Sequence, residues 1–87
     1  MNQTTQNSRP MLYTVKEVSQ ILHTNTTYVY ELIKSGLLPA LKLGSYKIRH
    51  ETLELFLRES EGKDITDPYY VQLIHTEAQP SLFTNRQ

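Results

Sequence analysis

The sequence predicts a mainly α-helical fold with a small β-hairpin, and three observations in residues 14–49 predict it. Two short segments carry apolar residues at helical spacing and are joined by only about three residues. Gly36 and Pro39 are suited to ending the second segment. A tight turn at Gly44-Ser45 follows, inside a stretch with three basic residues. This order is typical of a helix-turn-helix followed by a wing.

Size and composition set the limits of the prediction. The chain has 87 residues, enough for one small domain with a single core. It has no cysteine, which excludes a disulfide framework and thiolate metal sites. No apolar run approaches the roughly 18 residues that a membrane span requires, and residues 1–10 lack the features of a signal peptide. We therefore expect a cytoplasmic protein without a membrane segment.

The formal net charge is zero, but the charges are distributed unevenly. Residues 10–50 hold five basic and two acidic residues, whereas residues 51–77 hold two basic and seven acidic ones. A basic first half indicates a polyanionic partner for that half. Charge alone is equally consistent with ordinary solvated faces.

The first helix is expected at residues 14–22. Thr14 is a good N-cap, and Glu17, three residues later, can bond back to the Thr14 amide in a capping box. The apolar stripe that should face the core consists of Val15, Val18, Ile21 and Leu22.

The second helix is expected to start after Asn25, whose side chain can accept from the amides of the first turn. Gly36 suits the left-handed conformation that ends a helix. The buried face should hold Val29, Leu32 and Ile33. The sides and exposed face should carry Thr26, Thr27, Tyr28, Tyr30, Glu31 and Lys34. Because the link from His23 to Asn25 is short, the two helices should cross steeply, as in a helix-turn-helix.

A hairpin is expected around Gly44-Ser45, which suits a two-residue type II′ turn. That turn places Lys42 opposite Lys47. It puts Leu41, Leu43, Tyr46 and Ile48 on one face, and Lys42, Lys47 and Arg49 on the other. Two lysines directly opposite each other repel, so this arrangement favours a nearby anion such as a phosphate backbone. The alternative is a plain solvated face of a half-buried hairpin.

A third helix is expected at residues 50–60, and Gly62 should end it. Its buried stripe should consist of Leu53, Phe56 and Leu57. Residues 69–74 fit either a short helix or a strand. The chain therefore divides into a disordered arm at residues 1–10, a winged helix-turn-helix domain at residues 11–60, and an acidic, partly disordered tail at residues 61–87.

Residues 11–57 resemble the excisionase-type helix-turn-helix family, small relatives of the DNA-binding domain of MerR regulators. The match runs through Tyr13-Thr14-Val15-Lys16-Glu17-Val18, Thr27 to Ala40, Lys42-Leu43-Gly44 to Ile48, and Leu53 and Phe56. The resemblance implies a winged helix whose second helix enters the major groove of double-stranded DNA, while the wing touches an adjacent groove or phosphates. His23 stands where relatives commonly have glycine, in a conformation that a histidine adopts only at some cost.

Family members act as recombination directionality factors, which bend DNA to favour excision by an integrase, or as small transcription regulators of mobile elements. The resemblance therefore also implies a bacterial or phage origin. The protein partner that it implies is an integrase or a second copy of the chain.

The expected DNA contacts come from the second helix and the wing. Thr26, Thr27, Tyr28 and Tyr30 are placed to meet base edges, thymine methyl groups or phosphates. Lys34 and the wing residues Lys42, Ser45, Lys47 and Arg49 should contact the backbone. Glu31 can accept from a cytosine amino group or repel phosphate, and we favour the second role. Tyr30 either contacts DNA or packs against the wing.

The sequence predicts neither a catalytic site nor a cofactor. His23, His50 and His75 lie far apart without a second ligand at metal spacing. We therefore expect a DNA-binding protein that is not an enzyme and has no metal, no cofactor and no small-molecule substrate. The alternative is a protein-interaction module that keeps the scaffold and docks a partner through its acidic segment, residues 51–77, which includes Tyr69, Tyr70 and Ile74.

Overall fold

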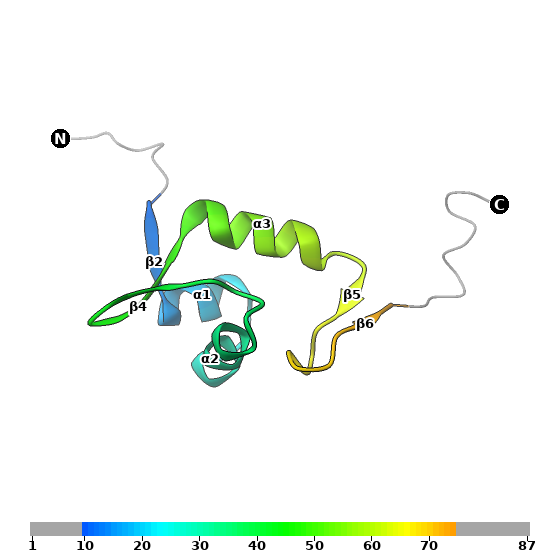
Figure 1. Cartoon of the computed structure of the whole chain (residues 1–87). Helices are drawn as coiled ribbons and strands as arrows, with labels where there is room; N and C mark the ends of the chain where they lie inside the picture. The colour runs from blue at the N-terminus through cyan, green and yellow to red at the C-terminus, as the bar shows by residue number, and fades with distance from the viewer. Residues whose placement is uncertain (1–9, 75–87) are drawn as a thin grey trace.

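The computed structural model describes residues 10–74, in which three helices pack with a small antiparallel sheet (Figure 1). The first elements are β2 (Leu12–Thr14), α1 (Val15–Ile21) and α2 (Thr26–Ser35). The central hairpin consists of β3 (Leu41–Leu43) and β4 (Ser45–Arg49), and α3 (His50–Ser60) follows it directly. Strands β5 (Lys63–Asp64) and β6 (Gln72–Leu73) form a second, smaller hairpin. The segments predicted to be disordered, at the two ends of the chain, fall largely on residues 1–9 and 75–87, which lie outside the described residues.

The first two helices begin with the caps that the sequence predicts. The Thr14 side chain accepts from the Glu17 amide at 3.1 Å, and the Glu17 carboxylate accepts from the Thr14 amide at 2.9 Å. The Asn25 side chain accepts from the Tyr28 amide at 2.8 Å. Gly36 ends α2 with a φ of 88°. The predicted positions of these two helices, and of the third at residues 50–60, are confirmed.

His23 lies in the turn between α1 and α2 with a φ of 58°, the left-handed region expected from its replacement of a glycine. That region costs a residue with a Cβ atom about 1–2 kcal/mol. We expect His23→Gly to raise the free energy of unfolding by up to about 1 kcal/mol, because the greater freedom of unfolded glycine offsets part of the gain. Urea unfolding of the two proteins measures the difference. A less stable glycine variant would contradict this explanation.

Strand β4 is the centre of the three-stranded sheet, in the order β2-β4-β3. Strand β2 was not predicted, because three residues are too few to show the alternation of a strand. In the hairpin, Lys42 lies opposite Tyr46, and only Gly44, with a φ of 77°, separates the paired Leu43 and Ser45. The predicted two-residue turn and the predicted pairing of Lys42 with Lys47 are therefore wrong.

This shift of register redistributes the side chains of the hairpin between its two faces. Lys42 shares a face with Tyr46 and Ile48, and Ile48 is fully buried. Leu41 and Leu43 lie on the opposite face with Lys47 and Arg49, and they are 42% and 60% exposed. The predictions of one apolar face and of one shared face for the three basic residues are wrong.

The core lies where the three helices meet β4. It consists of Val15, Val18, Val29, Leu32, Leu38, Ile48, Leu53 and Phe56. Leu57 was expected in it but is 41% exposed, because α3 packs through Leu53 and Phe56 and turns Leu57 toward its edge. Ile21 is likewise 42% exposed at the end of α1. No helix within residues 10–74 has the length and apolarity needed to cross a bilayer.

Candidate nucleic-acid interface

Helix α2 turns one side to the core and leaves a polar row on the other side. Val29 and Leu32 are fully buried. Thr27, Tyr30 and Lys34 are exposed, and their spacing of three and four residues aligns them along one side of the helix. Thr26 is exposed at the first turn. This side of α2 therefore offers hydroxyl groups and one ammonium group to a ligand.

The β3–β4 hairpin adjoins this row through aromatic side chains. The rings of Tyr30 and Tyr46 meet edge to face, with centroids 6.2 Å apart. The Lys42 ammonium group lies 4.8 Å from the centre of the Tyr46 ring, within the range of a cation–π contact. Of the two roles considered for Tyr30, the structure shows packing against the hairpin, while 42% of the residue stays exposed. Lys42 is thereby held beside the exposed row of α2.

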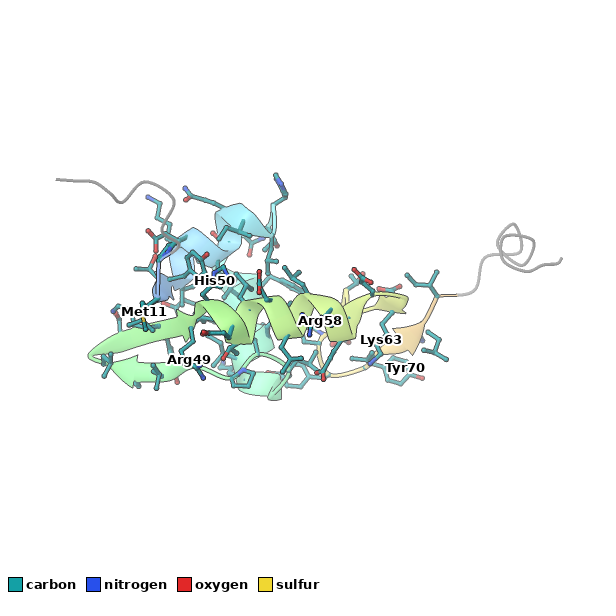
Figure 2. The ribbon with its side chains drawn as sticks, turned by 90° about the horizontal axis from the view of Figure 1, so that it is seen from above. Met11, Arg49, His50, Arg58, Lys63 and Tyr70 are labelled. Atoms are coloured by element: carbon teal, nitrogen blue, oxygen red, sulfur yellow. The ribbon has the colours of Figure 1, made fainter. Side chains whose placement is uncertain are left out.

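The other hairpin residues predicted to bind DNA lie at its tip and at its base. The Lys47 ammonium group donates to the Ser45 hydroxyl at 2.7 Å, next to the turn at Gly44. Arg49 lies at the base, where α3 begins (Figure 2), and its guanidinium is 3.2 Å from the Glu51 carboxylate. A backbone hydrogen bond and, after it, Arg49 lower the pKa of Glu51. The structure thus brings Lys42 close to α2, but not Arg49, and Lys47 lies on the hairpin face opposite Lys42 and Tyr46.

Tyr28, predicted on the sides or the exposed face of α2, lies on a side of the helix and is half-buried against the segment that follows α3. Its hydroxyl donates to the backbone carbonyl of Ile65. Burial raises the pKa of Tyr28, and the carboxylates of Asp64 and Asp67 raise it further. We call residues 61–74 the C-terminal arm, because they form the connection from α3 through β5 to the end of β6.

Glu31, three residues from Tyr28, is also held by the C-terminal arm. The Tyr69 hydroxyl donates to the Glu31 carboxylate at 2.8 Å, and this hydrogen bond raises the pKa of Tyr69. The Lys34 ammonium group lies farther from the same carboxylate, at 4.0 Å. Sequence reasoning missed the roles of Tyr46 and Tyr69 here, since both act through contacts with α2 that no local pattern reveals.

The polar groups of the described chain offer little to a metal ion. Within residues 10–74, no three His, Asp or Glu side chains gather in a way that could hold one. His50 instead shares a hydrogen bond of 2.8 Å with the Tyr13 hydroxyl and lies 3.3 Å from the Glu54 carboxylate. The hydrogen bond with Tyr13 ties β2 to the first turn of α3. His75 lies outside the described residues.

A scan against models of protein families matches residues 12–61 to a helix-turn-helix domain. The matched stretch contains α1, α2, the β3–β4 hairpin and α3, and it ends where the C-terminal arm begins. Searches of curated proteins and of solved structures found no match. A helix-turn-helix domain suggests a DNA-binding function, and such domains are typically not enzymes.

Proposed function

The chain belongs to the excisionase-type helix-turn-helix domain family, and we propose on this basis that it binds double-stranded DNA with α2 in the major groove. The β3–β4 hairpin acts as a wing on the neighbouring backbone. The observation that carries this proposal is the junction of Tyr30 with Tyr46, which sets Lys42 beside the exposed row of α2.

The proposed contacts follow from the position of each group. Thr26, Thr27 and Tyr30 face base edges and thymine methyl groups. Lys34 and Lys42 bind phosphates on the hairpin side. Lys47 and Ser45, on the opposite face of the hairpin near its tip, supply a further phosphate contact. The Glu31 carboxylate accepts a hydrogen bond from Tyr69. Of its two possible roles, we favour repulsion of phosphate over contact with a base. Tyr28 and Arg49 are left out of the interface, because Tyr28 lies on the flank of α2 away from the hairpin and Arg49 lies at the start of α3.

A salt titration tests this proposal. We expect a short fluorescent duplex of mixed sequence to bind at about 50 mM salt and to lose affinity toward about 200 mM, with a slope that reflects roughly three phosphate contacts. A single strand of the same sequence is the control and should bind more weakly, because it has no major groove for α2. The proposal fails if the duplex does not bind at the lowest salt concentration, or binds no better than the single strand.

We further propose that the chain serves a mobile genetic element, as an excisionase-like factor or as a transcription regulator. Either role requires a small protein that holds a duplex, and a recombinase or a second copy of the chain is the partner that fits it. A bend in the bound duplex, measured by the gel mobility of permuted fragments, supports the first role. An unbent duplex supports the second.

A further inference from the structure

The C-terminal arm lies beyond the matched domain and yet packs on its DNA-facing helix. Figure 1 shows the arm descending from the end of α3 to the level of α2. Ile65 packs against the core, and Pro68 is buried. The packing of Ile65 anchors the arm to the domain.

Two hydrogen bonds hold the arm to one particular flank of α2. Tyr28 donates to the Ile65 carbonyl, and Tyr69 donates to Glu31 at 2.8 Å. Tyr28 and Glu31 are three residues apart and share this flank. Tyr30, which meets the hairpin, lies about 200° around the helix from Tyr28. The arm and the hairpin therefore border the exposed row of α2 from opposite sides.

The charge of the arm opposes a phosphate backbone. It contains three acidic residues and one basic residue, for a net charge of −2. Asp64 and Asp67 lie close enough to Tyr28 to raise the pKa of its hydroxyl. A helix in the major groove nearly fills its width of about 12 Å, so phosphates pass along both flanks of the helix. On the hairpin flank they meet Lys42, and on the other flank they meet the acidic arm.

The arm has the features of an element that can be displaced. Its strands have two residues each, and a two-stranded hairpin of this kind is marginally stable in water. Its apolar side chains are largely exposed, with Tyr69 at 59%, Tyr70 at 68% and Leu73 at 69%. Release therefore disrupts little apart from the packing of Ile65 and Pro68 and the two tyrosine hydrogen bonds.

We propose that the C-terminal arm is an autoinhibitory cover of the DNA-binding face, which blocks one flank of α2 and is displaced by the duplex. This inference rests on the proposed function, because only a DNA-binding face can be inhibited in this way. The hydrogen bond from Tyr69 to Glu31 holds the arm on α2. The carboxylates of Asp64 and Asp67 repel the phosphates of the duplex.

Variants of the 87-residue chain test the Tyr69–Glu31 hydrogen bond and the charge separately. Tyr69→Phe removes the hydroxyl that reaches Glu31 and should tighten duplex binding by about threefold to tenfold, because the open state becomes more populated. The double variant Asp64→Asn/Asp67→Asn keeps the side-chain oxygens that accept from Thr66 and from the Tyr69 amide, and should also tighten binding. Glu54→Gln/Glu59→Gln is the matched control, because it removes two negative charges from α3 and none from the arm. Its gain should be clearly smaller.

Hydrogen exchange of the wild-type protein gives a second readout. The amides of Thr66, Tyr69, Tyr70 and Ile74 are hydrogen-bonded within the arm. We expect these amides to exchange faster when the mixed-sequence duplex is added, and faster in free Tyr69→Phe than in the free wild-type protein. Slower or unchanged exchange with bound duplex, or a gain from the asparagine variant no larger than that of its control, overturns the cover while leaving DNA binding intact. Failure of every variant to bind duplex at low salt overturns the proposed function and the cover with it.

Discussion

Leu32→Ala is expected to lower the free energy of unfolding by about 2–5 kcal/mol. Leu32 is fully buried on the core side of α2, and its backbone carbonyl also accepts from the Leu38 amide, at 3.2 Å. The substitution leaves a cavity in a core of eight buried apolar residues, which has few alternative packings. Since small domains are stable by only about 5–15 kcal/mol, this decrease is a large part of the total.

Leu57→Ala is the matched control for this prediction. It removes the same atoms from a helix position that is 41% exposed, so it should cost less than about 1 kcal/mol. Urea unfolding followed by circular dichroism measures both variants. Equal destabilisation by the two substitutions would contradict the observed packing of α3 and restore Leu57 to the core, where its spacing in the sequence placed it.

Replacing two exposed lysines is expected to cause a large loss of DNA affinity. Lys34→Ala/Lys42→Ala should weaken duplex binding at about 50 mM salt by roughly tenfold for each lysine, because a phosphate that no lysine neutralises keeps its condensed counterion. Both lysines are exposed, and the cation–π contact of Lys42 with Tyr46 is worth only about 0.5–1 kcal/mol at such a site. The melting temperature should therefore change little. An unfolded double variant would instead show that the lysines stabilise the fold.

Local signals made the helices predictable. The capping box of Thr14 with Glu17, the Asn25 cap and the Gly36 stop each act within four residues, so they can be read directly from the sequence. The hairpin register could not be read in this way. Gly44-Ser45 marks a turn but leaves the length of the turn open. In the structure, Ile48 also pairs with Tyr13 of β2, a strand that was not predicted, and this pairing accompanies the observed register.

The candidate site was also predicted only in part, because local spacing positions some of its residues and contacts between distant segments position the others. The exposed row on α2 follows from helical spacing, and the structure places Thr27, Tyr30 and Lys34 on it. Tyr28 and Glu31 form hydrogen bonds with residues 37 and 38 positions away. No periodic pattern in the C-terminal arm predicts these contacts, so only the structure reveals that the arm covers this flank of α2.

We claim that DNA meets the row on α2 together with the Lys42 side of the hairpin, and the slope of log affinity against log salt decides whether it does. The comparison variant, Arg49→Ala/Arg58→Ala, also removes two positive charges, but from the start and the last turn of α3 (Figure 2). We predict that Lys34→Ala/Lys42→Ala reduces the slope by about two, whereas the arginine variant leaves it nearly unchanged. An equal or larger reduction in the arginine variant would contradict the claim and move the DNA to the α3 side of the molecule.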